Sequence, residues 1–167
     1  MRHVVTIVSA DSPPPPARPA GFTVVELLIV MVVMGLVTAI TFPRVSAARS
    51  SAALHAARVQ FVASLATARQ AAVRFGRPAQ LRRSGNSIEV RADSDGTGVF
   101  VSLAHPVPLD SQFSVTLTAT VDSIVFGPRG LASNLSSSGA RFALARGTAQ
   151  DSVCLTRLGE LAPRGCR

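Results

Sequence analysis

One carboxylate lies inside the most apolar stretch of the chain. Residues 22–42 form an apolar run in which Glu26 is the single charged side chain. As an α-helix this run would rise about 30 Å, which is the thickness of the hydrocarbon core of a bilayer. A carboxylate without a partner in lipid costs at least ~2.5 kcal/mol. We therefore expect Glu26 to lie near a membrane interface or to meet a positive charge.

Gly21 separates the apolar run from a polar N-terminal segment. This segment contains four consecutive prolines from Pro13 and a further proline at Pro19, which exclude a helix continuous with the apolar run. Its own apolar stretch, residues 4–8, is shorter than the roughly 7–15 apolar residues of a secretory signal peptide. A break at this point indicates removal of the segment by a protease.

The charge balance of the chain is strongly basic. It has 167 residues and no lysine, and its 17 arginines against 9 acidic residues give a formal net charge of +8. This balance favours anionic partners such as nucleic acid or phospholipid. The length is enough for about one domain, which argues against a multidomain enzyme. Two cysteines and three scattered histidines do not make a metal cluster, so we expect no metal and no cofactor.

No nucleophile is paired with a base in this sequence. Serines are abundant, but His55 falls on a predicted helix, His105 precedes a proline, and no G-x-S-x-G pattern occurs. Gly127-Pro-Arg-Gly130 predicts a turn rather than a phosphate-binding loop. We therefore predict a protein that is not an enzyme.

A short acidic segment has some features of a calcium loop. Asp93-Ser94-Asp95-Gly96 supplies oxygen ligands two residues apart and a glycine for the turn. An EF-hand would also need a glutamate further along the loop, and residues 101–104 contain none. The preferred interpretation is a β-turn between strands, with a calcium site as the alternative.

A second helical pattern follows the apolar run. After Pro43, six apolar residues share one stripe of a helix, which we expect to pack on its own domain. The six are Leu54, Phe61, Leu65, Ala68, Ala72 and Phe75. Arg58 and Arg69 flank this stripe, where their long stems can cover apolar surface. Gly76 and Pro78 are expected to end the helix.

The remainder of the chain predicts short strands separated by turns. The predicted strands are residues 79–83, 87–92, 98–104, 113–119, 123–126, 140–145 and 152–158. Antiparallel strands packed on one helix make an α+β domain. The predicted organisation is a leader at 1–21, a membrane helix at 22–42, an amphipathic helix at 43–76 and a β-rich head at 77–167.

The junction resembles the processing site of type IV pilins and type II secretion pseudopilins. The sequence there is Gly21-Phe22-Thr23-Val24-Val25-Glu26-Leu27-Leu28-Ile29-Val30. It shares with these proteins the glycine before the cut, the phenylalanine after it, the glutamate at the fifth position after it and the apolar run. The resemblance implies cleavage between Gly21 and Phe22 by a prepilin peptidase and N-methylation of Phe22. The leader departs from the pattern because it is long and has only Arg2 and Arg18 as positive charges.

Processing would give Glu26 a partner. Cleavage creates an ammonium group at Phe22, which a carboxylate one turn away or on a neighbouring subunit can neutralise. In a low dielectric such a pair fixes register more than it adds net stability. The alternative is that Glu26 only lies in the lipid headgroup zone.

Three further segments are similar to the minor pseudopilin and minor pilin family (GspH/FimT). They are residues 65–73, 124–130 and 153–161. The resemblance implies a type IV pilin-like fold, in which a long N-terminal helix packs on a C-terminal antiparallel sheet. It also implies a single-pass inner-membrane protein with its head in the periplasm. The function would be that of a minor pseudopilin, a structural subunit of the type II secretion pseudopilus. Its partners would be other pseudopilins or pilins, contacted through the N-terminal helix.

A head outside the cytoplasm permits a disulfide between Cys154 and Cys166. A loop of this size would contribute about 3 kcal/mol in the chain-entropy model. We expect the disulfide to form, and a buried free Cys154 is the alternative.

The arginines leave a second function open, that of a minor type IV pilin that binds DNA. Some members of the family bind DNA during uptake through a basic C-terminal region. Loss of residues 1–21 would leave 15 arginines and 8 acidic residues, a charge of +7. Arg157, Arg164 and Arg167 are the candidates for phosphate contact. The lack of Tyr and Trp weakens any stacking on single strands, and the preferred interpretation of these arginines is a solvated surface.

Overall fold

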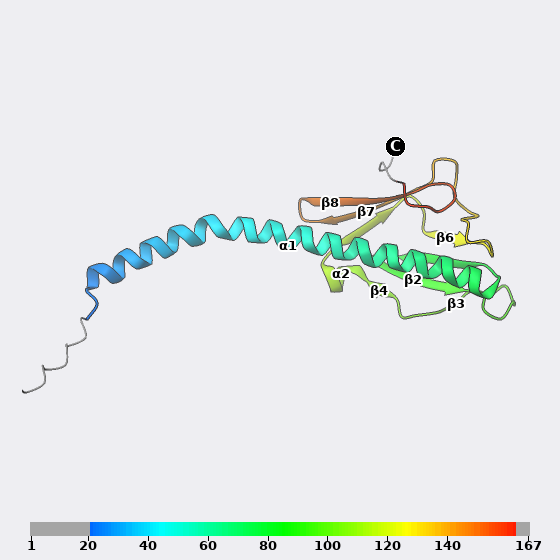
Figure 1. The fold of residues 1–167 in the computed structure, drawn as a ribbon, viewed down its shortest axis with the longest axis horizontal. Helices are drawn as coiled ribbons and strands as arrows, with labels where there is room; N and C mark the ends of the chain where they lie inside the picture. The colour runs from blue at the N-terminus through cyan, green and yellow to red at the C-terminus, as the bar shows by residue number, and fades with distance from the viewer. Residues whose placement is uncertain (1–20, 163–167) are drawn as a thin grey trace, which may run out of the picture. The chain divides into compact units, whose positions relative to one another are not determined.

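In the computed structural model, residues 21–162 are described, apart from the side chain of Pro43. The chain divides into two compact units, residues 1–41 and residues 42–167. Helix α1 (Val24–Phe75) contributes residues to both units, whereas all the strands belong to the second (Figure 1).

The first unit is the apolar part of α1. Every large apolar side chain from residue 22 to residue 40 is at least 50% exposed, so the helix is apolar on all sides and buries none of them within its unit. Among the described residues, α1 is the one helix that is long and apolar enough to cross a membrane. The hydroxyls of Thr38 and Thr41 donate to the carbonyls of Met34 and Val37, at 2.7 and 2.8 Å. These polar groups therefore need no water.

In the second unit, α1 buries one stripe in the head. Five of the six predicted stripe residues are at most 6% exposed, but Phe75 is 37% exposed, so the prediction is wrong for that residue. Phe75 is the last helical residue, and the chain leaves the helix direction at Gly76, whose φ is +63°. A left-handed residue after the last turn is a common helix end and suits glycine. Ala57 and Ala71 widen the buried stripe.

The strands form two antiparallel sheets. The first sheet contains β1 (Ala79–Ser84), β2 (Ser87–Ala92), β3 (Val101–Ser102), β4 (Val107–Pro108) and β6 (Ser123–Phe126). Its order is β3-β2-β1-β6, and β4 also pairs with β2. The second sheet, in the order β5-β7-β8, contains β5 (Thr116–Ala119), β7 (Ala140–Arg146) and β8 (Ala149–Leu155). A long helix with antiparallel sheets is the predicted α+β class.

One hydrophobic core joins α1 and both sheets. Phe61 of α1 is fully buried against Phe142 of β7, with ring centroids 4.7 Å apart and planes tilted by 43°. In the first sheet, Leu81 lies opposite both Val90 and Ile124, and all three side chains are buried. The core therefore depends on contacts between segments that are far apart in the sequence.

Three predicted strands differ from those observed. Of the predicted strand 98–104, only β3 is observed as a strand. Gly98, which precedes β3, has a φ of +80°, outside the range of an extended strand. The predicted strand 113–119 begins later, because α2 (Leu109–Phe113) ends at Ser114 in a left-handed conformation. The last strand lies three residues earlier than predicted, because Thr156 and Gly159 close a turn directly after β8, with a 2.9 Å hydrogen bond from the amide of Gly159 to the carbonyl of Thr156.

Candidate functional site

The predicted cleavage junction, Gly21-Phe22, precedes α1. Phe22 is 82% exposed, and a Cβ added to Gly21 would meet nothing within 4 Å. The contacts of the described residues therefore do not require glycine at position 21. The leader up to residue 20, including Arg2 and Arg18, lies outside the described residues.

Thr23 caps the N-terminus of α1. This cap was not predicted from the sequence. The Oγ1 of Thr23 accepts a hydrogen bond from the backbone N–H of Glu26 at 3.1 Å. The signal was present as the pattern T-x-x-E before an apolar run, which is the pattern of a capping box. Glu26 consequently lies in the first turn of α1, where a negative charge interacts favourably with the helix dipole. The structure shows no ion pair for Glu26 within residues 21–162.

The segment at 124–130 docks on α1 through Arg69. The Nε of Arg69 donates to the carbonyl of Gly130 at 2.6 Å, and its guanidinium carbon lies 5.8 Å from the ring centroid of Phe126. Gly130 has a φ of +72°, and a Cβ there would lie 3.2 Å from Cγ2 of Val73. The segment at 124–130 therefore has a structural role in the head, where it packs against α1.

We expect Gly130→Ala to destabilise the head by about 1–3 kcal/mol, because it forces a side chain into the left-handed region against Val73. Gly147→Ala is the matched control, since Gly147 has a φ of +58° with nothing within 4 Å. Urea unfolding of the purified full chain measures both. An equal loss of stability in the two variants would contradict the packing role of Gly130.

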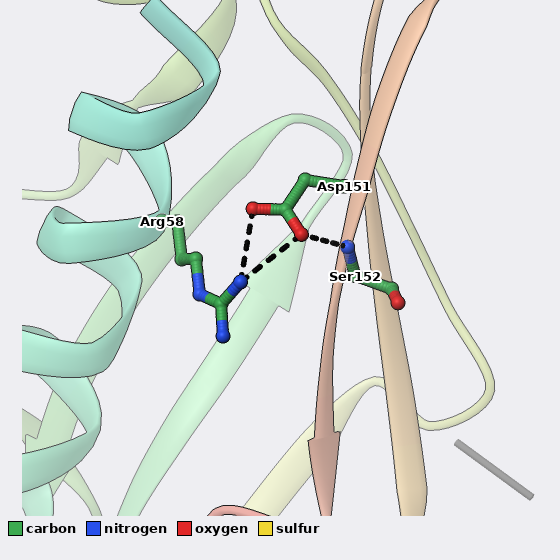
Figure 2. Close-up of polar contacts among 3 residues, drawn as sticks. All are labelled: Arg58, Asp151 and Ser152. Atoms are coloured by element: carbon green, nitrogen blue, oxygen red, sulfur yellow. Dashed lines mark hydrogen bonds and ion pairs between the residues drawn. The ribbon is translucent and has the colours of Figure 1, made fainter. Parts of the chain in front are cut away.

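An ion pair links α1 to β8 (Figure 2). Nη1 of Arg58 lies 3.1 and 3.2 Å from the two carboxylate oxygens of Asp151, and the amide of Ser152 donates to Asp151 at 2.7 Å. The side chains of Arg58 and Asp151 are 46% and 30% exposed. Such a pair contributes at most about 1 kcal/mol. The pair orients the hairpin of β7 and β8 on α1, and we assign it a structural role.

The arginines proposed to contact DNA are only partly described. Arg157 lies in the turn after β8, rather than on the strand as predicted, and it is exposed. Arg164 and Arg167 lie outside the described residues. DNA contact through the three therefore stays a prediction.

Of the three arginines that follow α1, Arg83 pairs with Asp122 and Arg77 lies against Gly96. Arg82 of β1 is exposed. These three consequently do not form one free basic patch.

Cys154 is 7% exposed on β8. The amide of Ala162 donates to the carbonyl of Cys154 at 2.8 Å, which returns the end of the described chain to this strand. Cys166 lies outside the described residues, so the disulfide stays a prediction.

The acidic segment forms a loop closed by its own side chains. Asp93 accepts a hydrogen bond from the amide of Gly96 at 2.8 Å. The hydroxyl and amide of Thr97 donate to Asp95 and lower the pKa of that carboxyl below its usual value. A Cβ at Gly96 would overlap the guanidinium of Arg77, so a positive charge already lies against the loop. Within the described part of the chain, no three metal-binding side chains come together.

Two family profiles match the chain. The family described as Type II transport protein GspH matches residues 56–159. The prokaryotic N-terminal methylation motif matches residues 17–42. A search of the curated proteins found no match.

Solved structures of a minor pilin are similar in fold. The crystal structure of the type IV minor pilin FimU of Pseudomonas aeruginosa (strain PAO1) in space group P21 has a TM-score of 0.52 at 15% identity, over 68% of this chain and 95% of that one. The same protein in space group P65 gives a TM-score of 0.47 at 14% identity, over 70% and 99% of the two chains. The first of these matches confirms the predicted type IV pilin-like fold.

The junction motif, the capped apolar helix and the α+β head thus agree with both profiles. The GspH profile alone covers more than half of the 167 residues. The chain belongs to the Type II transport protein GspH family, whose members are pilin-like structural proteins.

Proposed function

We propose that the protein is a minor pseudopilin, a structural subunit of the type II secretion pseudopilus. The observation that carries the proposal is one chain with both the methylation motif at 17–42 and the GspH profile at 56–159. The exposed apolar surface of α1 supports it, because that surface needs either lipid or the helices of other subunits. The helix would hold the protein in the inner membrane with its head in the periplasm, and would then pack into the filament.

Glu26 would act at the transfer from membrane to filament. After cleavage each subunit carries an ammonium at Phe22 and a carboxylate at Glu26, both close to the start of α1. A subunit that enters the filament in the correct register gives each of these charges an opposite partner. A displaced subunit leaves them unpaired in a low dielectric, at a large cost in free energy.

We expect Glu26→Ala to insert in the membrane and to assemble poorly. The loss of one partner of a buried ion pair costs about 3–5 kcal/mol, so the fraction of the protein in filaments should fall at least about tenfold. Quantitative blotting of the membrane fraction and of filaments purified from disrupted cells measures this. Glu26→Gln should behave like Glu26→Ala, because it keeps the length and removes the charge.

Thr23→Ala is the matched control for Glu26. It removes the helix cap, at a cost of about 1 kcal/mol, and keeps the carboxylate. We expect it to assemble almost normally. Normal assembly of Glu26→Ala at native expression would contradict the ion-pair role of Glu26. It would mean that Glu26 only lies in the lipid headgroup zone.

A deletion strain tests the secretion role. We expect type II substrates to remain in the periplasm while surface pili form normally, with recovery on complementation. Loss of pili with normal secretion would overturn the pseudopilin proposal in favour of a minor type IV pilin. Unchanged secretion and unchanged pili would contradict both roles.

A further inference from the structure

The head has a hollow of about 410 Å³ between the loop after β6 and the turn after β8. Arg129 and Leu131 from the loop, and Arg157 and Leu158 from the turn, line it. The two segments are joined directly, because the amide of Ala132 donates to the carbonyl of Leu158 at 3.1 Å. The walls of the hollow therefore hold each other in place.

Asn134 fixes the loop side of the hollow. Its Oδ1 accepts from the amide of Val125 and its Nδ2 donates to the carbonyl of Ser123, both at 2.8 Å. The Asn134 side chain thus makes hydrogen bonds that a neighbouring strand would make along the unpaired edge of β6. A loop held in this way keeps its side chains in position before a ligand arrives, which lowers the entropic cost of binding.

The two arginines at the hollow, Arg129 and Arg157, have no ion-pair partner among the described residues. Arg58, Arg83 and Arg91 form ion pairs with acidic residues of the same chain. Arg129 and Arg157 are exposed, and the structure shows no ion pair for either of them among residues 21–162. Two guanidinium groups on opposite walls of one hollow favour a ligand with carboxylate or phosphate groups.

The leucines of the hollow decide between these two ligand classes. Leu131 and Leu158 are 40% and 47% exposed beside the arginines. A DNA duplex presents sugar and phosphate groups to a protein that binds its backbone. These groups would leave the exposed leucines without apolar contacts. A peptide can place an apolar side chain next to a carboxylate, so it can contact both the arginines and the leucines that line the hollow.

We infer that this hollow binds an acidic segment of another protein subunit, with its carboxylates on Arg129 and Arg157 and an adjacent apolar side chain on Leu131 and Leu158. The inference rests on the proposed function only in taking that subunit to be part of the filament. Its test uses purified protein and is independent of any secretion phenotype.

The test is peptide binding to the full processed chain in detergent micelles, followed by fluorescence anisotropy. The probes are a labelled Leu-Glu-Glu-Leu peptide, the matched Leu-Gln-Gln-Leu peptide and a short duplex DNA. We expect saturable binding of the glutamate peptide, with the glutamine peptide at least about tenfold weaker. Arg129→Gln and Arg157→Gln should each weaken the glutamate peptide about tenfold. Both side chains are exposed, so the variants should keep the thermal unfolding of the parent.

Arg141→Gln is the matched control, because Arg141 is an exposed arginine of β7 and the substitution removes the same charge. It should leave peptide binding unchanged. The inference is overturned by equal binding of the two peptides, by no saturable binding at millimolar peptide, or by an equal effect of Arg141→Gln and Arg157→Gln. Tighter binding of the duplex through Arg129 and Arg157 would make the hollow a phosphate site and would also overturn it.

Discussion

Replacing Gly21 with leucine should leave the full-length precursor in the membrane and abolish its incorporation into filaments. A Cβ at position 21 meets nothing within 4 Å among the described residues, so folding should be unaffected. A bulky side chain should instead stop the peptidase from approaching the bond before Phe22. We expect mature protein to fall below detection, as measured by intact mass and by blotting of membrane extracts.

Gly35→Leu is the control for this prediction. Gly35 also has nothing within 4 Å of an added Cβ, and it lies inside the apolar part of α1, away from the junction. Its precursor should be processed normally, whatever the substitution does to packing between helices. Normal maturation of Gly21→Leu would contradict cleavage at this bond, and failure of both variants would point to a general defect in insertion.

Phe61→Ala should have the largest effect on the stability of the head. Phe61 is fully buried against Phe142 and belongs to the stripe with which α1 enters the core. Truncation of a buried phenylalanine leaves a cavity and costs about 3–5 kcal/mol, which is a large part of the stability of a domain of this size. We expect a lower urea midpoint and a lower level of the protein in cells.

Val59→Ala provides the comparison for Phe61. Val59 lies two residues earlier on α1 and is 54% exposed, so the variant should change stability by no more than about 0.5 kcal/mol. Similar losses in the two variants would mean that the exposed face of α1 also contributes to folding.

The features that could be predicted from the sequence are those that depend on local patterns. The apolar run, the stripe from Leu54 to Ala72 and the helix end at Gly76 all follow from helical periodicity and from glycine's tolerance of positive φ. The strands predicted at 87–92 and 123–126 are observed as β2 and β6 with the same bounds. The methylation motif required only residues 21–30, and the matching profile at 17–42 supports it.

The Thr23 cap was missed although its pattern is local, whereas other missed features depend on contacts between distant segments. The last strand was predicted to extend to residue 158, because the alternating pattern continues past Leu155, where the turn between Thr156 and Gly159 ends β8. The hollow brings Arg129 together with Arg157, which are 28 positions apart, through a hydrogen bond that no local pattern encodes. Arg157 could be identified as a basic residue, but its position in a turn required the structure.

The composition of purified filaments tests the filament role most directly. Filaments purified from disrupted cells that express the protein at its native level should contain the chain with an N-terminal methylated Phe22, as shown by mass spectrometry of the first peptide. The same preparation from Glu26→Ala cells should contain at least about tenfold less of it. Filaments that lack the chain altogether, while it remains in the membrane with Met1 intact, would contradict both its processing and its role as a filament subunit.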